Sequence, residues 1–109
     1  MDEVVFLYTT WPDAETAEAA AVDAVEQRLA ACANLMAPMP SVYRWEGKIE
    51  RTEEIPVIFK TTARVAAELS RRLVQRHPYD TPAIAALPVA MDGSNPGFLA
   101  WIGAETGRG

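Results

Sequence analysis

The chain has 109 residues, enough for one hydrophobic core that buries roughly 65% of the surface exposed by an unfolded chain. Half of the residues are apolar and 23% are charged, which is typical of a globular protein and excludes a disordered one. The net charge of −5 argues against a nucleic-acid-binding protein, because neutralising phosphates requires clustered Lys and Arg.

The first part of the chain predicts a strand followed by a helix. Residues 4–8 form a continuous apolar run, typical of a central strand, and residues 9–13 break it. A helical pattern then extends from residue 14 to about residue 31, with Thr10 or Asp13 as its N-cap. Its predicted buried stripe consists of Ala17, Ala21, Val22, Val25 and Leu29.

The centre of the chain predicts a long β-hairpin over residues 41–62. A strand at 32–36 is interrupted by Pro38 and Pro40, and strands at 42–45 and 48–62 flank the dipeptide Glu46-Gly47. Glycine tolerates the positive φ angle of a two-residue turn, so Glu46-Gly47 is the expected turn. A turn at residues 51–52 is a less favoured alternative. The prolines mark exposed edges or bulges, because proline cannot donate to a sheet ladder.

The last part of the chain predicts a second helix, a strand and a short terminal helix. The helix covers residues 63–76, where Glu68 can pair with Arg72, and a strand follows at 83–91. Asn95 is the expected N-cap of a helix at 97–106, and residues 107–109 are expected to fray. The order β-α-β-β-α-β plus a C-terminal helix predicts an α+β fold, a ferredoxin-like sandwich with both main helices on one face of the sheet.

Targeting and charge patterns leave few options for location. The single cysteine excludes an intrachain disulfide, and neither a signal peptide nor an apolar run of ~20 residues is recognisable. We therefore expect one soluble, cytoplasmic domain over residues 1–109.

Residues 1–46 carry eight acids and two bases, whereas one predicted helix carries Arg64, Arg71, Arg72 and Arg76. That basic face is either simply solvated or contacts an anion or a partner.

Few residues are candidates for catalysis or metal binding. His77, the only histidine, lies in the polar loop 77–82 and is a candidate metal ligand, proton carrier or hydrogen-bonded loop residue. Cys32 is either a core residue or a nucleophile, which would need a histidine partner such as His77. Lys60 ends an apolar strand and either meets a carboxylate or extends to water. Because no complete catalytic set is present, the residues predict a protein that is not an enzyme.

Five stretches, taken together, resemble the CutA family of divalent-cation-tolerance proteins. They are RLAACAN at 28–34, YRWEGK at 43–48, KTT at 60–62, HPYDTP at 77–82 and FLAWI at 98–102, in order over about residues 4–105. The resemblance implies a ferredoxin-like subunit in a homotrimer similar to PII-type signal transducers. It also implies that the hairpin strands pair with neighbouring subunits and that clefts form between chains.

The resemblance also implies a role in tolerance of copper and other divalent metals, without catalysis. The family's copper-binding member uses a cysteine where this chain has Thr9 (or Tyr8) and a histidine pair where it has Arg76-His77, while Cys32 matches a family cysteine. His77 and Cys32 are therefore the metal candidates, with copper or another divalent cation bound and no cofactor required. The candidate lining of the inter-subunit cleft is Trp45, Glu46, Lys60, His77 and Tyr79.

Three hypotheses follow. The first is a non-enzymatic trimeric protein of metal tolerance. The second is a PII-like sensor of a small molecule that signals to a partner protein. The third is a small hydrolase that uses Cys32 or His77.

Overall fold

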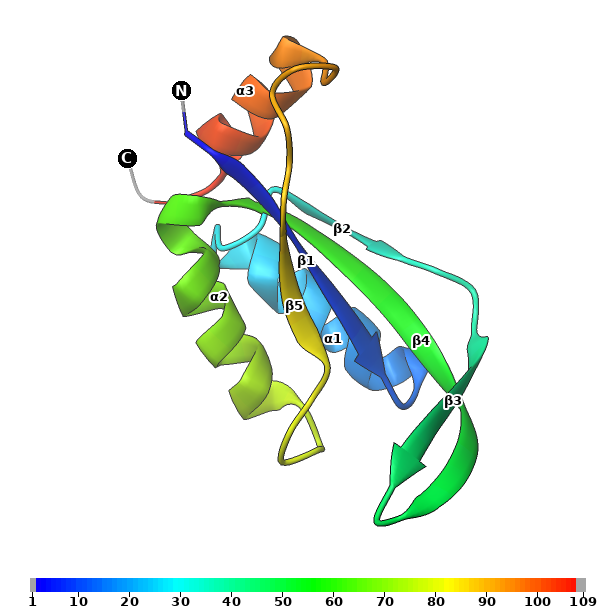
Figure 1. Ribbon diagram of the computed structural model, residues 1–109. Coiled ribbons are helices and arrows are strands. Elements are labelled where there is room, and N and C mark those ends of the chain that lie inside the picture. Colours follow the sequence, from blue (N-terminus) through cyan, green and yellow to red (C-terminus); the bar gives the residue numbers. More distant parts are fainter. Residues whose placement is uncertain (1, 108–109) are drawn as a thin grey trace.

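The computed structural model describes residues 2–107, and its helices and strands follow the predicted order (Figure 1). They are β1 (Val4–Trp11), α1 (Ala14–Glu26), β2 (Cys32–Leu35), β3 (Met39–Trp45), β4 (Lys48–Thr62), α2 (Ala63–Arg76), β5 (Ile84–Pro88) and α3 (Pro96–Glu105). The predicted α+β class with a C-terminal helix is confirmed. The proposed fraying of Arg108 and Gly109 falls outside the described residues.

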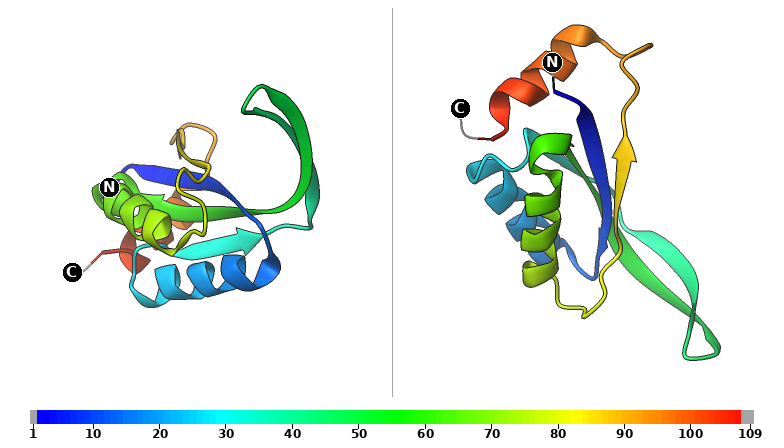
Figure 2. Two further views of the ribbon diagram at one scale, coloured as in Figure 1. Left: turned by 90° about the horizontal axis from the view of Figure 1, so that it is seen from below. Right: turned by 60° about the vertical axis from the view of Figure 1, so that its left-hand side comes forward.

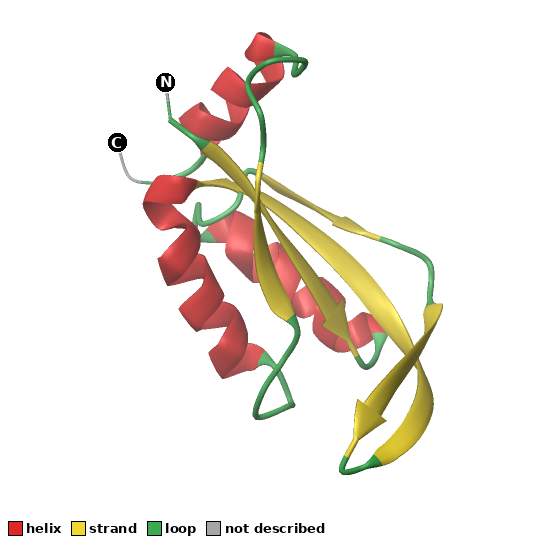
Figure 3. Cartoon of the chain, viewed as in Figure 1, coloured by secondary structure: helices red, strands yellow, loops and turns green. Residues whose placement is uncertain are grey.

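One antiparallel sheet carries the fold, in the order β2-β4-β1-β5. This is the strand order of a ferredoxin-like sheet, with β1 and β4 side by side at the centre and β2 and β5 at the edges. β3 lies off this path and, within residues 2–107, pairs with β4 alone, so the β3–β4 hairpin projects beyond the body of the sheet (Figure 3).

The two faces of the sheet are covered by different helices. Side chains alternate along β1, so Leu7 and Trp11 enter the core cluster that α1 and α2 cover. Val4, on the opposite face, packs with Leu99 and Ile102 of α3. α3 therefore covers only one end of the second face, and Figure 2 shows it apart from the other two helices.

α1 is shorter than predicted and buries a different stripe. It ends at Glu26 because Arg28 adopts a left-handed conformation (φ 60°), which a helix cannot continue. Its buried residues are Ala17, Ala20, Ala21 and Ala24. The predicted contributors Val22 and Val25 remain 49% and 41% exposed. Small side chains let α1 lie close to the sheet and turn its valines outward.

Two strand boundaries also differ from the prediction. β1 does not break after Tyr8, because β4 continues to pair with it up to Trp11, opposite Ile55. The last strand is confined to Ile84–Pro88, where it pairs with β1. A partner strand thus sets where each strand ends.

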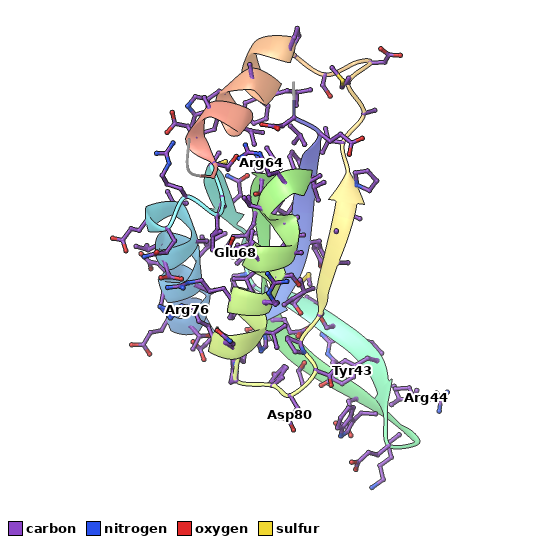
Figure 4. The ribbon with its side chains drawn as sticks, turned by 90° about the vertical axis from the view of Figure 1, so that its left-hand side faces the viewer. Tyr43, Arg44, Arg64, Glu68, Arg76 and Asp80 are labelled. Atoms are coloured by element: carbon purple, nitrogen blue, oxygen red, sulfur yellow. The ribbon has the colours of Figure 1, made fainter. Side chains whose placement is uncertain are left out.

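An ion pair that was not predicted from the sequence joins α1 to α2. Arg72 Nε and Nη2 donate to the two carboxylate oxygens of Asp23 at 2.6 and 2.9 Å, and Arg76 Nε lies 3.4 Å from Asp23. Arg72 therefore bonds Asp23 of α1 rather than Glu68 of its own helix. Figure 4 shows Arg76 pointing toward α1.

The C-terminal segment is anchored as far as Gly107. The Gly107 N–H donates to the Arg28 carbonyl at 2.7 Å, and Arg28 Nε donates to the Gly107 carbonyl at 3.2 Å. The prediction of a frayed end is therefore wrong for Gly107, which is buried.

Candidate functional site

His77 follows the last residue of α2 and is only 6% exposed. Its Nε2 lies 2.8 Å from the carbonyl oxygen of Thr10, and its Nδ1 accepts the backbone N–H of Tyr79 at 3.1 Å. A carbonyl can only accept, so Nε2 carries the proton and the ring is the neutral Nε2–H tautomer. Both ring nitrogens therefore have hydrogen-bond partners, so His77 would have to give up one of these bonds to bind a metal ion, and its role as a metal ligand stays a prediction.

Aromatic rings enclose His77 on both sides. The Trp11 ring centroid lies 4.4 Å from that of His77, and the Tyr79 centroid lies 4.9 Å away. Burial raises the pKa of Tyr79, and the neighbouring Glu54 carboxylate raises this pKa further. The Thr10 hydroxyl donates to Glu54 at 3.1 Å, which ties the end of β1 to the base of the hairpin. These contacts join β1, β4 and loop 77–82.

Thr9, which with Tyr8 as the alternative is the residue that the resemblance sets at the position of a family cysteine, has a structural role here. Its hydroxyl donates to the Val57 carbonyl at 2.8 Å and accepts the Trp11 indole N–H at 2.8 Å. The side chain is fully buried. Thr9 therefore holds Trp11 in the core and offers no soft ligand.

Lys60 lies at the other end of the sheet. Phe6 and Cys32 pair directly with it from the two flanking strands, so all three side chains share the face opposite α1 and α2. The Lys60 ammonium lies 5.5 Å from the Phe6 ring centroid and 5.4 Å from that of Phe98, within the range of cation–π attraction. The free Cys32 thiol is half-buried beside it.

Trp45 and Glu46 lie at the tip of the projecting hairpin. Trp45 is 60% exposed, and Glu46 and Gly47 have φ angles of 50° and 80°, as a two-residue turn of the predicted kind requires. Tyr43, on the same hairpin, faces the loop that carries Asp80, whereas Arg44 points away (Figure 4). The turn prediction is confirmed.

Within one chain, the candidate residues fall into three separate groups. His77 and Tyr79 contact each other, Trp45 and Glu46 lie at the hairpin tip, and Lys60 lies with Cys32. Phe6, beside Lys60, and Thr10, beside His77, are four residues apart on β1, which is roughly 13 Å. Cys32 and His77 also lie on opposite faces of the sheet, so one chain pairs them neither as metal ligands nor as nucleophile and base.

The structure adds residues to the His77 group that sequence reasoning missed. They are Thr10, Trp11, Tyr43 and Glu54. Trp11 was predicted to lie in a strand break, and no signal in the sequence placed it beside the polar motif 77–82. Among residues 2–107, no group of three or more His, Cys, Asp or Glu side chains could hold a metal ion.

Comparison with known proteins gives a consistent result. The family model described as "CutA1 divalent ion tolerance protein" matches residues 5–105. The chain is 39% identical over 107 residues to the divalent-cation tolerance protein CutA of Thermus thermophilus, covering 98% of this chain and 100% of the relative.

Solved structures agree with the sequence match. CutA1 of Ehrlichia chaffeensis superimposes with a TM-score of 0.91 at 34% identity, over 99% of each chain. A protein of Archaeoglobus fulgidus described as a periplasmic divalent cation tolerance protein CutA gives 0.87 at 38% identity, over 94% of this chain and 97% of that one. That description concerns another compartment, so the cytoplasmic location of this chain stays a prediction. No helix in the described residues is both long and apolar enough to cross a membrane. Its sequence and its fold together show that the chain belongs to the CutA1 divalent ion tolerance family.

Proposed function

We propose that this chain is a non-enzymatic homotrimeric protein of divalent-cation tolerance that binds copper, another divalent cation or a small ligand in clefts between its subunits. One observation carries the proposal: the projecting hairpin exposes large apolar side chains on both of its faces. Val42, Trp45 and Ile49 are 65%, 60% and 63% exposed. Such a surface is costly to leave in water and is typical of an interface.

The distribution of the candidate residues supports the same proposal. The hairpin tip, the His77 group and the Lys60 group lie apart within one chain. A neighbouring hairpin laid against either group would bring residues of two chains together. Of the two metal candidates, Cys32 keeps a free thiol, whereas His77 would first have to give up one of its hydrogen bonds.

The experiment separates assembly from metal binding. Val42 and Ile49 lie on the hairpin face opposite Trp45, because Ile49 pairs with Arg44 and Trp45 pairs with Lys48. The double variant Val42→Asp/Ile49→Asp therefore disrupts the interface and leaves the candidate lining unchanged. Val74→Asp, at a 44% exposed valine of α2, is the matched control.

Light scattering should give three times the chain mass for the wild type and the control, and one chain mass for the double variant. Equilibrium dialysis against Cu²⁺ and Zn²⁺ should show metal bound by the trimers and lost from the monomer, with copper reduced by Cys32→Ser. A monomeric wild type would refute the assembly. Equal metal uptake by monomer and trimer would refute a site between subunits, and no uptake would refute the metal part.

A second candidate, the sensor of a small molecule, is favoured by Lys60. Its ammonium is held between two rings beside a free thiol, which presents a fixed positive charge to an anionic ligand. A ligand that binds only the folded protein raises its melting temperature. Anionic metabolites should therefore raise Tm in the wild type and not in Lys60→Met; no shift in either protein would refute this function.

A further inference from the structure

The loop between β5 and α3 contains an aspartate followed by a glycine, Asp92-Gly93, at the end of the molecule far from the hairpin (Figure 1). Both residues are exposed. The Ser94 N–H donates to the Met91 carbonyl at 3.1 Å, so Asp92 and Gly93 are the central residues of a β-turn. Gly93 has a φ of 91° and Asp92 a negative φ, which is the pattern of a type II turn. The turn therefore depends on the absence of a side chain at Gly93.

An aspartate can react with the backbone of the residue that follows it. The nitrogen of that residue attacks the side-chain carbon Cγ, and the protonated carboxyl loses its hydroxyl group, which leaves as water together with the amide proton. The product is a cyclic succinimide. The reaction requires a carboxyl group without other partners, open space around the attacking nitrogen and a backbone that can rotate.

The carboxylates of three of the five aspartates have partners. Asp2 and Asp23 form ion pairs with arginines of α2, and Asp13 caps the N-terminus of α1. Within residues 2–107, the side chains of Asp80 and Asp92 make neither a hydrogen bond nor an ion pair, and both residues are exposed. These two carboxylates are the candidates for the reaction.

The following residue distinguishes the two candidates. Asp80 precedes Thr81, whose branched Cβ crowds the attacking nitrogen. Gly93 has no side chain, and no atom lies within 4 Å of the position that its Cβ would take. The exposed turn around it is closed by a single backbone hydrogen bond, and such a turn opens locally without global unfolding. Among the five aspartates, Asp92 alone meets all three requirements.

We propose that Asp92-Gly93 is a site of spontaneous backbone isomerisation, at which Asp92 forms a succinimide with the Gly93 nitrogen and becomes isoaspartate. Water then attacks the former backbone carbonyl of Asp92 and breaks its bond to the Gly93 nitrogen. That carbonyl becomes a free α-carboxylate, and the chain continues through Cγ with one additional methylene group. One water is released and one is taken up, so the reaction needs no other reactant.

The additional methylene group changes the connection between β5 and α3. It lengthens the chain between Met91 and Ser94, which removes the hydrogen bond that closes the turn. Asn95, the N-cap of α3, follows directly, and Phe98 of α3 lies 5.4 Å from the Lys60 ammonium. Isomerisation therefore alters the loop beside the Lys60 group. This inference does not depend on the proposed function, since it needs neither a second chain nor a metal ion.

The test compares Asp92 with Asp80 in the full-length protein after several weeks at pH 7.4 and 37 °C. Peptide mapping with electron-transfer dissociation distinguishes isoaspartate from aspartate at each position. Isoaspartate at residue 92 should exceed that at residue 80 at least tenfold. Labelled methyl transfer from S-adenosylmethionine by an isoaspartyl methyltransferase, which acts on the new α-carboxylate, should rise in parallel. Equal amounts at both positions, or none at residue 92, would refute the proposal.

Two variants at Asp92 change the rate in opposite directions. In Asp92→Glu the longer side chain would have to close a larger ring, so methyl acceptance should fall at least tenfold. Asp92→Asn closes the same ring and releases ammonia, a better leaving group from a neutral amide than hydroxide from a carboxylate, so isoaspartate should form faster than in the wild type. Asp80→Glu is the matched control and should change nothing. Wild-type rates in both Asp92 variants would contradict the assigned site.

A last comparison shows whether the folded turn reacts. Asp23→Asn on α1 lowers global stability, yet the rate at Asp92 should not change, because only the turn has to open. A faster rate in that variant would mean that the reaction requires global unfolding, and the proposal would be wrong. In the isomerised protein, the Ser94 amide should exchange hydrogen faster, while exchange in β1 and β4 stays the same. An unchanged Ser94 amide would contradict the loss of the turn.

Discussion

His77 binds two backbone groups that are far apart in the sequence. It joins the Thr10 carbonyl at the end of β1 to the Tyr79 N–H in the loop after α2, between two aromatic rings. A buried backbone group left without a partner costs about 1–3 kcal/mol. The residue therefore fixes the loop onto the sheet, whatever else the site does.

We expect His77→Ala to lower the free energy of unfolding by about 3 kcal/mol, because the variant loses both hydrogen bonds and the ring packing. His77→Phe keeps the ring and loses only the hydrogen bonds, so its loss should be smaller. Urea denaturation measures both values. A cost below 1 kcal/mol for His77→Ala would contradict the structural role.

Asp23 makes stability depend on pH. Hydrogen bonds from Arg72 hold the pKa of Asp23 below its ordinary value, and the nearby Arg76 charge lowers this pKa further. Since the pKa is lower in the folded state, the stabilisation is present above the unfolded pKa, near 4. It is lost as pH falls through the folded pKa.

Asp23→Asn should lower the free energy of unfolding at pH 7, because it removes the ion pair. The loss should be only about 1 kcal/mol, since the arginine side chains are partly exposed and water screens the pair. Below pH 3 the difference from the wild type should shrink toward zero. Urea denaturation at both pH values measures it, with Glu18→Gln on the same helix as the control. A difference that persists below pH 3 would contradict the assigned ion pair.

At the scale of elements, the hairpin turn depends on two consecutive positive φ angles. Gly47 (φ 80°) has no atom within 4 Å of the position that a Cβ would take, so a side chain there meets only backbone strain. Gly47→Ala should destabilise the hairpin by about 1 kcal/mol. Glu46→Asn should stabilise it, because asparagine tolerates this conformation better than glutamate.

Amide hydrogen exchange of β3 and of the first half of β4 measures these changes locally. Exchange in the hairpin should become faster in Gly47→Ala and slower in Glu46→Asn, while exchange in β1 and β5 should not change. The same sign for both would mean that contacts at the tip, rather than backbone conformation, set the stability of the turn.

The elements also show which features the sequence determines. The predicted bounds of β4 and α2 agree with the structure, because Gly47 and Pro78 interrupt the pattern at their ends. The prediction extended α1 too far, because the helix ends at Glu26 before a left-handed Arg28, and nothing in the sequence marks Arg28 for that conformation. The site was predicted only in part: the motif around His77 was visible, but its contacts with Thr10 and Trp11 depend on strand register, which hydrophobic pattern alone does not fix.

At the scale of the whole molecule, the hairpin makes the chain elongated. Its radius of gyration is 14.6 Å, with extents of 45 × 28 × 22 Å, whereas a typical domain of this length has a radius of about 13 Å. An arm that exposes apolar side chains gains little stability from its own chain. In the proposed trimer, contacts with other copies would stabilise this arm.

A trimer held by these hairpins should have a stability that depends on protein concentration. Association shifts the folding equilibrium by mass action, so Tm should rise with each tenfold increase in concentration. The variant Val42→Ser/Ile49→Ser removes exposed apolar area and adds no charge, so its Tm should be lower and independent of concentration. Val74→Ser on α2, at a similarly exposed valine, should retain the dependence. A concentration-independent Tm in the wild type, over a range where light scattering shows dissociation, would mean that the hairpin is stable without a neighbour.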